Sequence, residues 1–193
     1  MAAFPGPDGL VSLASVFGNP NFRSEELLAY EAGYRAQASR RISADVSAFY
    51  NIYDHLRTFE PVEPFLESSP SPLHLVIPQE TMNKMHGNTY GAEVSSTLSV
   101  SRWWKVSPGY AWLKMNLHAD PGSLDTNSPL AVGNSPRHQF QTRSSIDLPQ
   151  YFEFDSGLYY VGRLSALDVS NHARVDARLG WRPGRSWEVS VVG

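Results

Sequence analysis

Hydrophobic and polar residues alternate along much of the chain, so that every second side chain is apolar over stretches of five to eleven residues. This period of two is typical of β-strands with one apolar face, whereas the i, i+3, i+4 spacing of amphipathic helices is nearly absent. The pattern predicts eight strands, at residues 30–38, 42–52, 90–100, 104–112, 140–148, 152–160, 173–181 and 187–191. We therefore expect an all-β fold.

Charged residues occupy only one face of these eight predicted strands. The apolar face holds forty positions and none of them is charged, whereas the opposite face of every strand carries at least one charge. A charge that faces lipid at the middle of a bilayer costs about 2–4 kcal/mol, but the core of a soluble sandwich excludes charges equally. The faces alone therefore leave two architectures open, a transmembrane β-barrel and a soluble β-sandwich.

The predicted connections alternate in length, and this favours the membrane barrel. Short connections lie at 39–41, 101–103, 149–151 and 182–186, and longer ones lie at 60–89, 117–138 and 163–172. Outer-membrane barrels have short turns on one side and long loops on the other, whereas sandwiches mix loop lengths at both ends. Residues 60–79 are rich in proline, and we interpret them as an extracellular loop rather than a linker between domains.

Aromatic residues on the apolar face gather near both ends of the predicted strands. The aromatics expected at a lipid interface are Trp104, Phe152, Trp181 and Trp187 near the short turns, and Tyr50, Tyr110, Trp112 and Tyr160 towards the long loops. Aliphatic residues fill the band between them, and Trp and Tyr prefer the two membrane–water interfaces. The sequence therefore predicts an antiparallel up-and-down transmembrane β-barrel.

Composition narrows the classes of function that this fold can serve. The 193 residues include no Cys, which excludes disulfide scaffolds, thiol nucleophiles and Cys-ligated metals. A net charge of −3 gives no electrostatic footprint for nucleic acid. No apolar run approaches the roughly 18 residues of a transmembrane helix. No nucleophile elbow, phosphate-binding loop or zinc-protease motif occurs, so we expect neither enzymatic activity nor a cofactor.

Three local features have alternative interpretations. The candidate metal ligands are the histidines His55, His74, His86, His118, His138 and His172. No two of them are spaced along the sequence like a chelating pair, so we interpret them as solvated residues of loops and strand ends. The segment 120–125 faintly resembles a calcium loop but lacks its alternating acids, and we interpret it as a turn. Pro108 removes a ladder donor, which predicts a bulge or an edge strand.

Several motifs resemble those of TonB-dependent outer-membrane receptors. The sequence GNPN at 18–21, followed by RSEE at 23–26 and AYEAGYR at 29–35, is similar to a passage in the second half of that family's barrel. Further segments that resemble family strands lie at 45–57, 90–93, 135–140, 147–149 and 174–181. Each motif is weak alone, but their order is that of the family over residues 18–193.

The resemblance implies part of a barrel of about 22 strands that an N-terminal plug domain fills. Such receptors lie in the outer membrane of Gram-negative bacteria. They import scarce solutes, such as ferric siderophores, cobalamin or haem, with energy from the TonB complex. Residues 1–193 would supply about eight strands, without the plug or the closing strand. Because residues 1–9 lack the features of a secretory signal and the strand at 187–193 stops unfinished, we expect a longer protein.

In such a barrel the charged face would point to the lumen and the plug. The candidate lumenal residues are Glu31, Arg35, Asp45, Glu93, Arg143, Asp147, Glu153, Asp155, Arg174, Asp176 and Arg178. The expected partners are outer-membrane lipid, the TonB complex through the plug, and a small-molecule or metal-chelate ligand. The alternative is a self-standing small β-barrel or β-sandwich that binds ligands at a surface, which predicts a water-soluble monomer. A third possibility, an outer-membrane hydrolase, would need a paired nucleophile and His.

Overall fold

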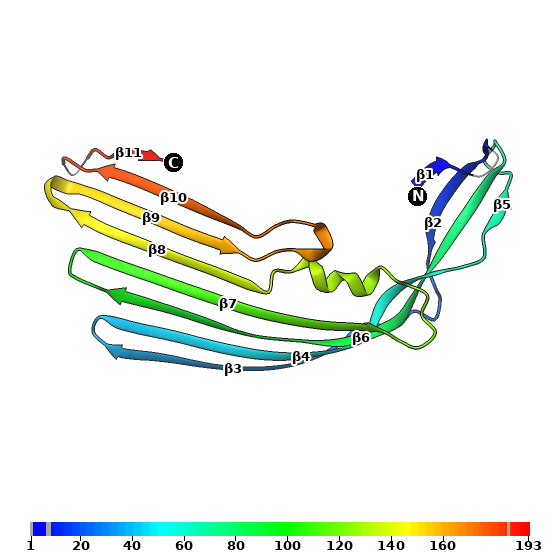
Figure 1. The fold of residues 1–193 in the computed structure, drawn as a ribbon, viewed down its shortest axis with the longest axis horizontal. Helices are drawn as coiled ribbons and strands as arrows, with labels where there is room; N and C mark the ends of the chain where they lie inside the picture. The colour runs from blue at the N-terminus through cyan, green and yellow to red at the C-terminus, as the bar shows by residue number, and fades with distance from the viewer. Residues whose placement is uncertain (1, 7–8, 185) are drawn as a thin grey trace. The chain divides into compact units, whose positions relative to one another are not determined.

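A computed structural model describes residues 2–6, 9–184 and 186–193 as one large β-sheet with little helix (Figure 1). The strands are β1 (Ala2–Pro5), β2 (Val11–Phe17), β3 (Glu26–Ser39), β4 (Ile42–Pro61), β5 (Phe65–Glu67), β6 (His74–Ser99), β7 (Trp104–Ala119), β8 (His138–Leu148), β9 (Phe152–Val161), β10 (His172–Trp181) and β11 (Val189–Val192). The short 3-10 helices are η2 (Ser128–Asn134), η3 (Pro149–Tyr151) and η4 (Ser165–Leu167). In the described residues, no helix has the length and apolar character needed to cross a membrane.

Contacts between residues divide the chain into two units, which we describe separately. Unit 1 consists of Met1–Leu28, Asn51–Asn88 and Asn116–Val132. Unit 2 consists of Ala29–Tyr50, Thr89–Met115 and Gly133–Gly193. The sheet order is β1-β2-β6-β7-β8-β9-β10-β11, and in addition β4 pairs with both β3 and β6, while β5 pairs with β6.

The register of unit 2 aligns the predicted apolar faces of five consecutive strands. One row of paired residues runs Trp104, Ile146, Phe154, Leu179, Val191 from β7 to β11. Residues that are directly opposite in an antiparallel pair point to the same side of the sheet. The uncharged positions of these strands therefore form one continuous face, as the alternation predicts.

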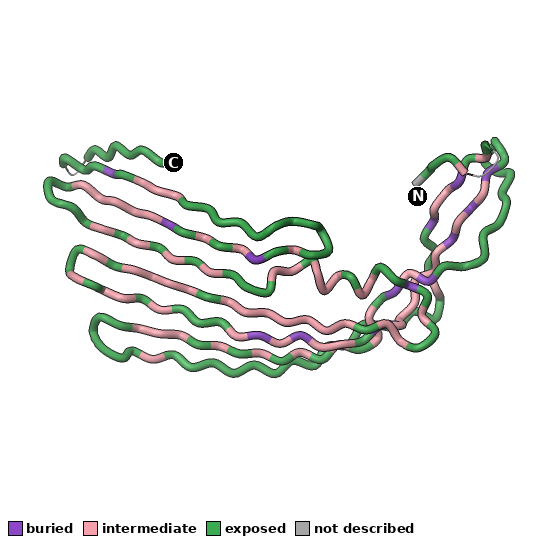
Figure 2. The backbone as a smooth tube through the Cα atoms, viewed as in Figure 1, coloured by how far each residue is buried: buried purple, intermediate pink, exposed green. Residues whose placement is uncertain are grey.

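This face is not buried within the chain, and Figure 2 shows how little of the sheet is buried at all. Among the described residues the only buried hydrophobic side chains are Val76 and Met85, whereas Val175 is 67% exposed and Val191 is 72% exposed. A soluble sandwich of this size would cover its apolar face with a second layer. The self-standing sandwich therefore does not match the structure, which is a barrel sheet that is not closed.

The structure corrects the predicted connection at 60–89. Strand β4 extends to Pro61 and β6 begins at His74, so only residues 62–73 connect them, and β5 lies within that stretch. Strand β2 pairs in parallel with β6 from Val11↔His74 to Phe17↔Glu80, which supplies backbone hydrogen bonds for a segment without alternation. The strand pattern missed this extension because the polarity of its residues does not alternate, and its partner strand β2 is distant in the sequence.

Pro108 lies neither at an edge nor at a bulge on its β8 side. Strand β7 lies between β6 and β8 in the sheet, so the predicted edge position is wrong. The register towards β8 runs without interruption through Ser107↔Arg143, Pro108↔Thr142 and Gly109↔Gln141. Strand β7 is therefore paired with both neighbours even though Pro108 has no backbone N–H to donate.

Candidate functional site

All the predicted lumenal residues lie on strands of unit 2. Glu31 and Arg35 are on β3, Asp45 on β4, Glu93 on β6, Arg143 and Asp147 on β8, Glu153 and Asp155 on β9, and Arg174, Asp176 and Arg178 on β10. The registers of β8, β9 and β10 bring several of them opposite one another, for example Asp147 opposite Glu153 and Arg178 opposite Asp155. That this face points to a lumen stays a prediction.

Ion pairs connect the charged residues of β9 and β10. The Arg178 guanidinium lies 2.9 Å from Asp155 and 3.4 Å from Glu153, and it also contacts Glu188. Arg182 lies 3.2 Å from Glu153 and 3.1 Å from Glu188. It follows Trp181, the last residue of the predicted strand at 173–181, so the alternation did not indicate it. Glu153 and Asp155 thus share an arginine, which is the arrangement of a cross-strand charge ladder rather than of paired catalytic carboxylates.

A hollow of about 330 Å³ lies along strands β4, β6, β7, β8 and β9 within unit 2. Its polar lining includes Asp45, Glu93, Gln139, Gln141 and Tyr159. At its margin Arg35 Nε donates a hydrogen bond of 2.5 Å to the Asp45 carboxylate. The hollow offers carboxylates, amides and a phenol, which suits hydrogen bonding to a protein segment or a hydrated ligand.

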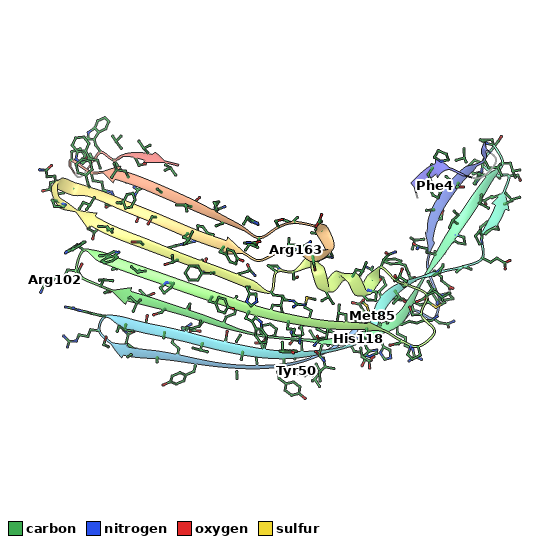
Figure 3. All side chains as sticks on the ribbon, viewed as in Figure 1. Phe4, Tyr50, Met85, Arg102, His118 and Arg163 are labelled. Carbon is green, nitrogen blue, oxygen red and sulfur yellow. The ribbon has the colours of Figure 1, made fainter. Side chains whose placement is uncertain are left out.

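The predicted interface aromatics form several ring contacts. Phe152 and Trp181 stack with centroids 5.8 Å apart, and Tyr90 lies between Tyr50 at 6.1 Å and Trp112 at 5.7 Å. Tyr50 projects from β4 in Figure 3. Of the remaining predicted aromatics, Trp104 donates a hydrogen bond to Ser144, and the Tyr110 hydroxyl lies 2.7 Å from a ring nitrogen of His138. Tyr160 is opposite Ala173 on β10, and Trp187 is 76% exposed. Their lipid contact stays a prediction.

Unit 1 contains two buried carboxylates that the strand pattern did not indicate. The Asp125 carboxylate accepts hydrogen bonds from the backbone N–H groups of Phe59 at 2.7 Å and Asn127 at 2.8 Å, and from Ser128. Glu60 accepts from the Ser123 hydroxyl and the Leu124 N–H, both at 2.7 Å. Side chains from β4 and from the loop after β7 thereby fix that loop to β4. The predicted turn at 120–125 is present, with a 3.0 Å bond from Ser123 N–H to the Asp120 carbonyl.

Two carboxylates, those of Glu25 and Asp125, accept hydrogen bonds from the edge of β4 where it extends past the first residue of β3. Strand β3 begins at Glu26, and after it the N–H of Arg57 donates to Glu25 at 2.9 Å and that of Phe59 donates to Asp125. Side-chain acceptors replace a partner strand here, as an otherwise unpaired edge requires. Burial raises the pKa of Asp125, but the hydrogen bonds from Phe59, Ser128 and Asn127 outweigh it and hold the pKa below its ordinary value.

The pKa of Glu60 is lowered in the same way. Burial raises it, and the opposing hydrogen bonds from Leu124, Ser123 and Thr58, together with the Lys84 ammonium 3.8 Å away, prevail. Both carboxylates are therefore ionised acceptors at neutral pH. They act as anchors for the loop, since every bond that they accept comes from β4, β6 or the loop itself.

All six histidines lie in strands, and four of them lie at strand ends as predicted, namely His74, His118, His138 and His172. His74 is nevertheless buried, at 4% exposure. Its ring nitrogens lie 2.9 Å from the Pro72 carbonyl and 3.3 Å from Glu67, so the interpretation of a solvated histidine is wrong there. The described part of the chain contains no group of three or more His, Cys, Asp or Glu side chains arranged to hold a metal ion.

A family model described as "TonB dependent receptor-like, beta-barrel" matches residues 3–193. The chain belongs to this family of TonB-dependent receptors. The family consists of transport receptors rather than enzymes. No curated protein matches the chain in sequence.

Solved receptor structures share this part of the fold. The FrpB iron transporter of Neisseria meningitidis aligns with a TM-score of 0.64 at 11% identity, over 87% of this chain and 26% of that one. The ferric-catecholate import receptor Fiu of E. coli K12 aligns with a TM-score of 0.59 at 16% identity, over 90% of this chain and 24% of that one. The alcaligin outer-membrane receptor FauA of Bordetella pertussis aligns with a TM-score of 0.55 at 13% identity, over 87% of this chain and 27% of that one. This chain of the TonB-dependent receptor family thus spans about a quarter of the length of these solved receptors.

Proposed function

We propose that this chain forms part of the barrel wall of an outer-membrane receptor that imports a scarce solute with TonB-coupled energy. The observation that carries the proposal is the continuous uncharged face from β7 to β11 in a chain of this receptor family. Lipid would cover that face, and the charged face would line the lumen. Further strands pairing with β3 and β11 would close the barrel, and an N-terminal plug would contact TonB.

A metal chelate is the favoured cargo, because the solved relatives are an iron transporter and receptors for ferric catecholate and alcaligin. Cobalamin and haem belong to the same class of scarce solute. Uptake of labelled ferric siderophores, haem and cobalamin would be measured in cells with and without the receptor gene, and with and without TonB. The proposal requires at least one solute whose uptake depends on both, and equal uptake of every solute in all strains would refute it.

The orientation of the sheet has its own test, which is helped by the absence of Cys from these 193 residues. Thr142 and Gln141 are adjacent on β8, and Thr142 pairs with Pro108 and Leu158 on the uncharged face. Thr142→Cys and Gln141→Cys would each carry a spin label on the receptor in outer-membrane vesicles. We expect the label at 142 to collide with oxygen, which concentrates in lipid, and the label at 141 to collide with a water-soluble nickel chelate. Equal accessibility at both positions would refute the lipid-facing assignment.

A further inference from the structure

Strands β6 and β7 bring two histidines together that are distant in the sequence. The N–H of Asp120 donates to the Lys84 carbonyl at 2.8 Å, and the side chain of Asn116 donates to that of Asn88 at 2.9 Å. His86 lies midway between Lys84 and Asn88, and His118, labelled in Figure 3, lies midway between Asn116 and Asp120. The two imidazoles are therefore cross-strand neighbours on one face, and their ring centroids are 6.1 Å apart.

A carboxylate orients one ring of this pair. The Asp120 carboxylate oxygen lies 2.5 Å from His86 Nδ1, and since a carboxylate only accepts, Nδ1 carries the proton. The lone pair of His86 is then on Nε2. A histidine that donates one ring N–H to a carboxylate and keeps the other nitrogen free has the arrangement found in most histidine-ligated metal sites.

The surroundings leave both rings accessible to a small cation. The His86 side chain is 49% exposed and His118 is exposed. Lys84, two residues before His86, directs its ammonium towards Glu60 at 3.8 Å and the Gly122 carbonyl at 3.5 Å. Asp120 adds a negative charge beside the rings, which favours a bound cation.

We propose that His86 and His118 form a surface site for a divalent transition-metal ion, with Asp120 as the residue that positions His86. Metal–nitrogen bonds are about 2.0–2.1 Å long, so the rings would need to rotate slightly towards each other, and water would complete the coordination. Imidazole ligands suit Cu²⁺, Ni²⁺ and Zn²⁺, and Cu²⁺ binds most tightly of the three. The site would join β6 to β7 at the base of the loop, and it does not depend on which solute the receptor imports.

The test is titration of the receptor in outer-membrane vesicles with Cu²⁺, followed by electron paramagnetic resonance. We expect one tightly bound Cu²⁺ with two equivalent imidazole nitrogens, displaced by excess Ni²⁺. His86→Asn and His118→Asn suit this face, because Asn88 and Asn116 already occupy it. Each should leave one nitrogen and weaken binding at least tenfold, and the double variant should lose the signal. His172→Asn is the matched control on β10 and should change nothing.

Asp120→Asn separates a positioning role from direct ligation. It should keep the two-nitrogen spectrum and weaken Cu²⁺ binding about tenfold, in the range typical of groups that orient a ligand. A two-nitrogen Cu²⁺ signal that survives in the double variant, or wild-type binding no tighter than that of the double variant, would overturn the proposal.

Discussion

Asp125 is the residue whose replacement should release the loop after β7. Asp125→Ala removes the acceptor of four hydrogen bonds, from the backbone of Phe59, Asn127 and Ser128 and from the Ser128 hydroxyl. A hydrogen bond to a charged group contributes about 1.5–3 kcal/mol. Asn127 is exposed and Ser128 is only half-buried, so some of these donors can bond to water instead. Counting two of the four bonds, at about 1.5 kcal/mol each, gives roughly 3 kcal/mol. At 1.4 kcal/mol for each factor of ten, loop opening should become about a hundredfold more frequent.

Hydrogen–deuterium exchange measures this opening directly. At neutral pH the amide of Phe59 should exchange about a hundredfold faster in Asp125→Ala than in the wild type, while amides in β9 keep their rates. Asp168→Ala is the matched control, since the Asp168 side chain is 92% exposed and pairs with Arg163 in another loop. If the Phe59 amide exchanges at the wild-type rate in Asp125→Ala, or equally fast in the control, the anchoring role is wrong.

Four further changes test other parts of the structure. Lowering the pH should also free this loop, because the pKa of Asp125 is lowered in the folded protein. The resulting stability is complete above the ordinary pKa of about 3.9 and is lost as the pH falls through the lowered pKa. The rate at which pepsin cleaves residues 120–137, divided by its rate on a free peptide of the same sequence, measures this opening. Gly91→Val should prevent folding, since a Cβ there would lie 2.4 Å from the Trp112 carbonyl oxygen, and unheated gel electrophoresis detects the folded form. Arg178→Met should lower the urea concentration at which the sheet unfolds, because three carboxylates lose a shared partner. Val175→Arg should cost about 2–4 kcal/mol in the same assay if lipid covers that face, whereas Val175→Leu should cost little.

The sequence by itself determined the strands that alternate and the faces that they present. Side chains of a strand alternate strictly, so the parity of an apolar residue fixes its face wherever the strand pairs. The row from Trp104 to Val191 follows from that parity, and the register of the structure confirms it. The family likewise followed from short motifs in their order, and the family match over residues 3–193 confirms it.

Only the tertiary structure decided what lies beyond the alternating segments. The extension of β6 to His74 depends on parallel pairing with β2, whose residues are about sixty positions away. The acceptor for Phe59 is Asp125, 66 residues later in the chain. No local pattern marks such partners, because the backbone groups that they satisfy are present in every residue.

The histidine pair shows the same limit most clearly. His86 and His118 are separated by 31 residues, so no spacing rule for chelating residues joins them. Antiparallel pairing of β6 and β7 places them side by side, because residues at equal distances from a cross-strand hydrogen bond face each other. Sequence periodicity therefore determined which way side chains point, and strand pairing determined which of them meet.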